Sequence, residues 1–184
     1  MKKINITDKI GTAITYKGCV TVEYFDKIDG KKVINAYNEG QTALFNAIVK
    51  MLEGRDINNI IRPSHIDLFA NDGSTVVEIL NGPVPYLNDP ILFRATKVYD
   101  EYGNVKYTYD NENIETQANC IMYSFTIALS NYVQGADGKV VTTLKLLNKD
   151  NGKVFAILDL ESINSTIKID TSSNMQIYWR LIFE

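Results

Sequence analysis

The chain has 184 residues, of which 45% are hydrophobic and 22% are charged, and its formal net charge is −3. This composition can bury one hydrophobic core, so we expect a single domain over residues 1–184 with a short polar N-terminal arm at 1–10. The slightly acidic balance argues against a nucleic-acid partner, which normally requires a basic surface. Apolar runs are too short for a membrane helix or a signal peptide, so the sequence predicts no membrane partner and synthesis in a cytoplasm.

The first strand signal covers Ala13 to Phe25. Apolar and aromatic residues such as Val20, Val22 and Tyr24 share one parity there, and polar residues fall between them. The segment Lys27 to Gly30 has the composition of a turn, because Asp-Gly tolerates positive φ. Val33 to Tyr37 then returns as the partner strand, and we expect Asn38 to Gly40 to lead into a helix.

A single helix is predicted at residues 42–53. Its apolar residues recur at the three- and four-residue spacing of one face, which must pack against another apolar surface. Thr42 is a suitable N-cap and Gly54 a suitable C-terminal residue. The residues expected to pack are Leu44, Phe45, Ile48, Met51 and Leu52.

A short strand is predicted around Ile66, Leu68 and Ala70, and it stops at the turn signal Asn71 to Ser74. The oxygen-bearing side chains of this turn raise the question of a calcium loop. They lack the regular acidic spacing and the closing Glu of an EF-hand. We therefore predict no metal site and no cofactor.

A loop with three of the four prolines follows at 81–90, and Phe93 to Asp110 then has the pattern of a hairpin with Gly103-Asn104 at its tip. Four tyrosines gather in this hairpin. Exposed tyrosines suit a contact surface for sugar or protein, because each offers apolar area and a hydroxyl group. Ordinary cross-strand pairing on a sheet is the alternative explanation for each of them. The candidate contact surface comprises Tyr99, Tyr102, Tyr107 and Tyr109.

The clearest strand runs from Ala118 to Leu129, with large apolar residues on one face and small uncharged residues on the other. This pattern predicts a central strand or one that is covered on both faces. Further strands are expected at 140–147, 154–160 and 163–169. The last segment, 175–184, alternates again, with Trp179 on its apolar face, and we expect it to join the sheet.

Together these segments amount to eight or nine strands connected by short turns, with one helix. The predicted fold is mainly β: an antiparallel, jelly-roll-like β-sandwich with the helix packed on one side or end.

Catalytic signatures are missing from the sequence. It contains no glycine-rich phosphate loop, no Gly-x-Ser-x-Gly and no His-Glu-x-x-His. The only histidine is His65, which excludes a zinc site with two histidines from one subunit. Cys19 and Cys120 lie in strand-like segments, where buried reduced thiols are favoured over a disulfide. We therefore expect no catalytic residues and no enzymatic activity.

Three segments carry a resemblance to a known group of proteins. They are Tyr37 to Gly40 followed by TALFNAIVKMLEG, then Arg62 to Leu68, and the ending QIYWRLIFE. Together they resemble small virion proteins of tailed bacteriophages, in which a leading hairpin precedes an apolar helix, a short strand and a final aromatic strand. The resemblance implies a structural subunit of the tail, neck or head fibres. Its expected partners are other virion proteins and further copies of itself in a ring or fibre.

Two other classes of function stay open. A carbohydrate-binding module would use the tyrosines around Gly103 and the single Trp179 as stacking platforms for a surface glycan. Trp179 shares its parity with Ile177, Leu181 and Phe183, which favours a core position over a platform. A small hydrolase on a sandwich scaffold would need a pair of carboxylates brought together in three dimensions, which a sequence of 22 acidic residues does not exclude.

Overall fold

A computed structural model describes residues 6–7, 13–14, 16–40, 63, 65–76, 91–112, 117–129, 137–148 and 152–183. The strands are β1 Ile6–Thr7, β2 Ala13–Ile14, β3 Tyr16–Asp26, β4 Gly30–Gly40, β5 His65–Phe69, β6 Ile91–Tyr99, β7 Val105–Asp110, β8 Cys120–Ala128, β9 Val140–Val141, β10 Thr143–Asn148, β11 Lys153–Asp159, β12 Ile167–Lys168 and β13 Asn174–Phe183. A 3₁₀ turn, η2, covers Glu161–Ile163.

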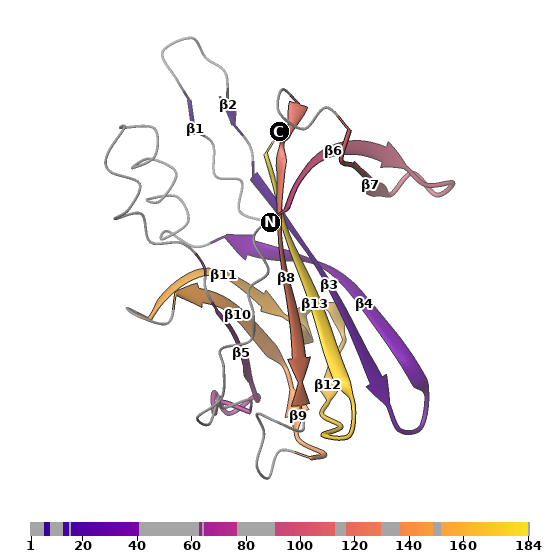
Figure 1. The fold of residues 1–184 in the computed structure, drawn as a ribbon, viewed down its shortest axis with the longest axis vertical. Coiled ribbons are helices and arrows are strands. Elements are labelled where there is room, and N and C mark those ends of the chain that lie inside the picture. Colours follow the sequence, from indigo (N-terminus) through magenta and orange to yellow (C-terminus); the bar gives the residue numbers. More distant parts are fainter. Residues whose placement is uncertain are drawn as a thin grey trace.

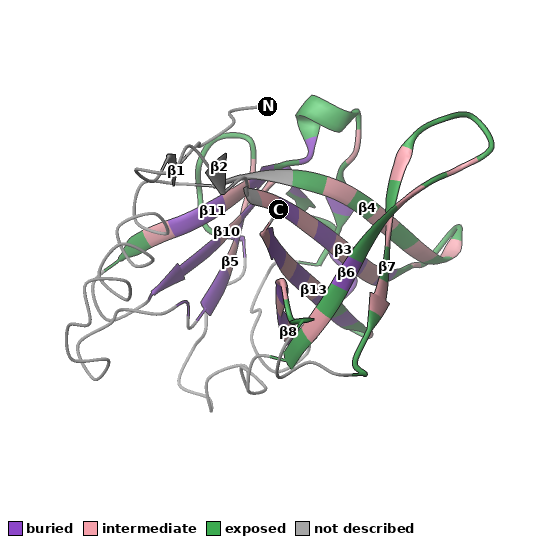
Figure 2. Ribbon diagram, turned by 90° about the horizontal axis from the view of Figure 1, so that it is seen from above, coloured by how far each residue is buried: buried purple, intermediate pink, exposed green. Residues whose placement is uncertain are grey.

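Nine of these strands form one sheet in the order β5-β10-β11-β4-β3-β13-β8-β6-β7. Neighbouring strands in it pair antiparallel, as in β3 with β13 and β13 with β8. The sheet curls, so that β5, β10 and β11 stand on one side of the molecule and β8, β13 and β3 on the other (Figure 1; Figure 2). The predicted mainly β, antiparallel architecture is confirmed.

The core lies on the inner, concave face of the curled sheet. Every second residue of the central strands points there, and Val22, Ile177 and Trp179 are completely buried. Side chains from both sides of the curl, such as Leu68 of β5 and Phe125 of β8, belong to one cluster. The alternation predicted from the sequence therefore identified the buried face, because successive side chains of a strand point to opposite faces.

Several predicted elements are found at the expected places. The β3–β4 hairpin turns at Gly30 with a φ of 77°, and the β6–β7 hairpin turns at Gly103 with a φ of 79°. The predicted C-terminal strand is β13, and it lies in the middle of the sheet between β3 and β8. Part of the N-terminal arm also pairs, since Ile6 of β1 lies opposite Ile14 of β2.

Two predictions about element boundaries are wrong. The strand predicted to end at Tyr37 continues as β4 to Gly40, which pairs with Ala156 of β11. That pairing connects the two sides of the curled sheet. The strand predicted from Ile163 begins only at Ile167, because Asn164 adopts a left-handed conformation with a φ of 52° after η2.

The predicted helix at 42–53, with Leu44, Phe45, Ile48, Met51 and Leu52, lies outside the described residues, as does the proline-containing loop at 81–90. Within the described part of the chain, no helix is long and apolar enough to cross a bilayer.

Candidate functional site

The four hairpin tyrosines differ in exposure, although the strand register places Tyr99, Tyr107 and Tyr109 on one face of the hairpin. Tyr99 and Tyr102 lie near the tip of the β6–β7 hairpin and are 65% and 80% exposed. Tyr107 and Tyr109, on β7, are half-buried. The predicted contact residues therefore comprise an exposed pair near the tip and a half-buried pair at the base, and their role as a contact surface stays a prediction.

The base of the hairpin folds against the outer, convex face of the central strands (Figure 2). A second small core forms there, in which Ala95, Cys120 and Ile182 are buried against Tyr107 and Tyr109. At the other end of β7, the Tyr37 hydroxyl donates a hydrogen bond of 2.9 Å to the Val105 carbonyl oxygen. These contacts hold β7 over β3 and β4, although β7 is the last strand of the sheet.

Tyr109 is packed among aromatic and cationic side chains. Its ring meets that of Phe93 edge to face, with centroids 6.3 Å apart. The guanidinium carbon of Arg180 lies 4.7 Å from the ring centroid, which is a cation–π contact. Burial raises the pKa of Tyr109 well above its usual value, so the phenol stays neutral.

A groove of about 370 Å³ lies between β7 and the outer face of β3 and β4. Its lining residues are Cys19, Val20, Thr21, Asn35, Ala36, Tyr37, Val105, Lys106, Tyr107, Tyr109 and Arg180. A pocket of this size, with aromatic walls and a few polar groups, has the dimensions of a small-molecule binding site.

A chain of hydrogen bonds crosses the floor of this groove. Arg180 Nη1 donates to Thr21 Oγ1 at 3.0 Å, and Thr21 Oγ1 donates to Asn35 Oδ1 at 2.8 Å. The strand register explains the chain, because Thr21 lies directly opposite Asn35 on β4. Each of these side chains points outward because it alternates with a core residue, as Thr21 does with Val20 and Val22.

Sequence reasoning found Tyr107 and Tyr109 but missed Arg180, Thr21 and Asn35. The only available signal was their parity, which predicts that they face away from the core. The strand order that brings β13, β3 and β4 side by side is not encoded in that parity.

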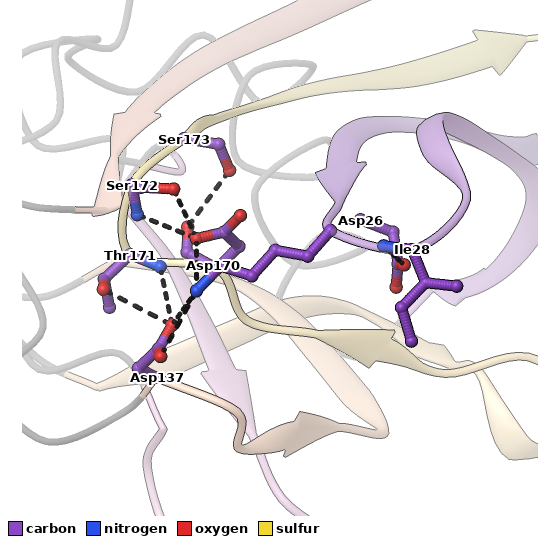
Figure 3. Close-up of polar contacts among 8 residues, drawn as sticks. Asp26, Ile28, Asp137, Asp170, Thr171, Ser172 and Ser173 are labelled. Carbon is purple, nitrogen blue, oxygen red and sulfur yellow. Dashed lines mark hydrogen bonds and ion pairs between the residues drawn. The ribbon is translucent and has the colours of Figure 1, made fainter.

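A second polar cluster ties the β3–β4 turn to two other loops (Figure 3). Lys27 Nζ lies 3.4 Å from Asp137 Oδ1 and 3.3 Å from Asp170 Oδ1. The Asp170 side chain is only 5% exposed and accepts hydrogen bonds from the hydroxyl and backbone N–H of Ser172, at 2.7 and 3.0 Å. These bonds, with the Ser172 hydroxyl contributing most, lower the pKa of Asp170.

The other two charges of this cluster are also stabilised by their neighbours. The backbone N–H of Thr171 lowers the pKa of Asp137, and the hydrogen bond to Asp170 raises the pKa of Lys27. All three groups are therefore charged at neutral pH. Because Lys27 occupies the position between the two carboxylates, we interpret this cluster as a clamp between loops rather than as a ligand site.

The turn at Asn71 to Ser74 forms a local hydrogen bond. Asp72 Oδ1 accepts the backbone N–H of Ser74 at 2.8 Å, and bonding to Ser74 lowers the pKa of Asp72. This is the geometry of an Asx turn. Across the described ranges, no group of three or more His, Cys, Asp or Glu side chains is arranged to hold a metal ion.

The two cysteines are free thiols that flank β13. Cys19 belongs to β3 and Cys120 to β8, so two inter-strand spacings, about 10 Å in total, separate their strands. A disulfide needs Cα atoms within ~7 Å, which agrees with the predicted reduced state. Burial raises the pKa of Cys120 to about 12, which keeps this thiol protonated and unreactive.

Comparison of the chain with models of protein families, with curated proteins and with solved structures gave no match.

Proposed function

We propose that this chain is a non-enzymatic structural subunit of a bacteriophage virion, acting by protein–protein assembly in the tail, the neck or the region of fibre attachment. It is made in the host cytoplasm and located in the virion. Its partners are other virion proteins, or further copies of itself in a ring or fibre. No catalysis, cofactor, nucleic acid or membrane enters this proposal.

The observation that carries the proposal is an apolar surface at the end of the β3–β4 hairpin. Phe25, Ile28 and Val33, which we call the hairpin patch, are 48%, 87% and 49% exposed. Phe25 and Val33 share the outer face of neighbouring strands, since Val33 lies opposite Glu23. Large apolar side chains exposed near one another on a small protein are typical of interaction surfaces.

We further propose that the curled sheet forms a jelly-roll-like sandwich, and that a helix at 42–53 covers its open side. The helix residues facing the core are Leu44, Phe45, Ile48, Met51 and Leu52. Support comes from the shared core, in which side chains of β5, β10 and β11 join those of β3, β13 and β8.

Replacing the hairpin patch should abolish self-association without unfolding the chain. We expect size-exclusion chromatography with light scattering to show oligomers of the wild-type protein at high concentration. The triple variant Phe25→Thr, Ile28→Ser and Val33→Thr should be monomeric. Because the three side chains are exposed, the free energy of unfolding should change by no more than about 0.5 kcal/mol for each substitution.

Val140→Thr provides the matched control, because Val140 is also exposed but lies on β9, outside the hairpin patch. This variant should associate like the wild-type protein. A wild-type chain that stays monomeric at high concentration and in its native particle contradicts the assembly proposal.

Binding of a host-surface glycan is the second candidate function, and the groove beneath β7 favours it. Tyrosine rings provide apolar faces for sugar rings, and the Thr21–Asn35 pair provides hydrogen-bonding groups beside them. Sugars are commonly bound by this combination of flat aromatic surface and directed polar groups.

Affinity electrophoresis of the full chain through gels that contain a panel of polysaccharides tests this function. We expect at least one polysaccharide to retard the wild-type chain and Asn35→Ala to reduce the retardation. Thr126→Ala, an exposed change on β8 outside the groove, should have no effect. Unchanged mobility on every gel excludes glycan binding.

A further inference from the structure

The charges lining the groove indicate which kind of sugar it accepts. Its lining contains two cationic side chains, Lys106 and Arg180, and no carboxylate. Lys106 has its own counter-ion, since its Nζ lies 3.5 Å from Asp100 Oδ2. Arg180 has no carboxylate within ion-pair distance among the described residues, so its charge is not neutralised by this part of the chain.

The guanidinium of Arg180 is held in place without using most of its donors. It lies against two tyrosine rings, with its central carbon 4.7 Å from the Tyr109 centroid and 5.5 Å from that of Tyr178. One of its five N–H groups reaches Thr21. The two rings hold the guanidinium, and its other N–H groups make no hydrogen bond among the described residues. A fork of this kind matches the two oxygens of a carboxylate.

Neutral hydrogen-bonding groups lie next to this cation. The Asn35 side chain accepts a bond from Thr21 through its oxygen, and within the described residues its amide N–H₂ makes no hydrogen bond. Asn35 is exposed and lies on the β4 side of the groove, opposite the tyrosines of β7. The groove therefore combines a fixed cation, a neutral amide donor and aromatic walls within about 370 Å³.

We propose that this groove binds a sugar that carries a carboxylate. The carboxylate lies on Arg180, the sugar hydroxyls meet Asn35, and the ring packs against the tyrosines of β7. This inference rests on the second candidate function, glycan binding, and specifies its ligand. The charge of Arg180 favours an anion, because charge-assisted hydrogen bonds are about twice as strong as neutral ones. Half-burial strengthens this selection, because opposite charges attract more strongly where water is partly excluded.

The test uses the full chain and a panel in which each acidic sugar, uronic or sialic, is paired with its carboxyl-reduced counterpart. Isothermal titration should show that at least one acidic sugar binds about tenfold or more tightly than its reduced counterpart. Arg180→Gln should remove this preference while leaving residual binding of both sugars. Arg180→Lys should restore only part of it, because an ammonium lacks the planar fork.

Arg94→Gln is the matched control, since it removes the same charge from an exposed position on β6 outside the groove lining, and it should behave like the wild-type chain. The comparison of paired sugars on the wild-type chain gives a result even if an Arg180 variant is unstable. Equal binding of acidic and reduced sugars overturns the acidic-sugar proposal and leaves glycan binding intact. No binding of any sugar overturns both. Succinate binding as tightly as the acidic sugars shows an anion site without sugar selectivity and also overturns the proposal.

Discussion

Ile177→Asp should unfold the protein. Ile177 is completely buried in the middle of β13, opposite Val22 on one side and Phe125 on the other. An aspartate there either buries an unpaired charge or is protonated at a large cost, and it also loses the apolar contacts of isoleucine. We expect a destabilisation of more than ~4 kcal/mol, a large part of the ~5–15 kcal/mol available to a typical domain. The measurements are the yield of soluble protein and the thermal unfolding curve. We expect either no soluble protein or no cooperative transition.

Thr126→Asp is the control for this substitution. It introduces the same charge into the same region of the sheet, but Thr126 is exposed on the outer face of β8. Its unfolding midpoint should stay close to that of the wild-type protein. If Ile177→Asp unfolds at the wild-type temperature, the assignment of the inner face of β13 to the core is wrong.

Trp179 should show a large difference between two substitutions. Its side chain is completely buried, yet its indole Nε1 makes no hydrogen bond within the described structure. Trp179→Ala should cost about 3–5 kcal/mol, because it removes apolar contacts and leaves a cavity. Trp179→Phe keeps a ring and also removes the unsatisfied donor, whose burial costs about 1–3 kcal/mol. It should therefore be much less destabilising.

Chemical denaturation of both variants measures this difference through the unfolding midpoints, provided that the denaturant slopes agree. Equal losses for the phenylalanine and alanine variants would show that Nε1 contributes favourably to stability. Nε1 would then have a hydrogen-bond partner in the native protein, and its assignment as an unsatisfied donor would be wrong.

Local features of the fold could be predicted from the sequence because they depend on neighbouring residues. The alternation of Ile177, Trp179 and Leu181 identified the buried face of the last strand, and all three are at most 1% exposed. Asp29-Gly30 and Gly103-Asn104 identified two hairpin turns, since each glycine adopts a positive φ. The prediction of Trp179 as a core residue, not a sugar platform, is confirmed on the same basis.

Features that depend on strand order could not be predicted. The predicted strand stops at Tyr37, yet β4 extends to Gly40, because pairing with β11 provides hydrogen bonds that local preference does not anticipate. The groove also depends on strand order. Arg180, Thr21 and Asn35 come from three strands, and β7 lies over them only because the hairpin folds onto the outer face.

The pairing of β3 with β13 also determines when the protein can fold. Thr21 and Arg180 bond to one another although 159 positions separate them in the chain. During synthesis, the edge of β3 that faces β13 therefore has no native partner until residues 174–183 have left the ribosome. Until then the hairpin carries an unpaired edge and an uncovered apolar face, the two features that promote aggregation. Closing so long a loop before any contact forms is entropically costly, which slows folding. A middle strand that is made after both of its neighbours makes the nascent chain the form of this protein most in need of protection.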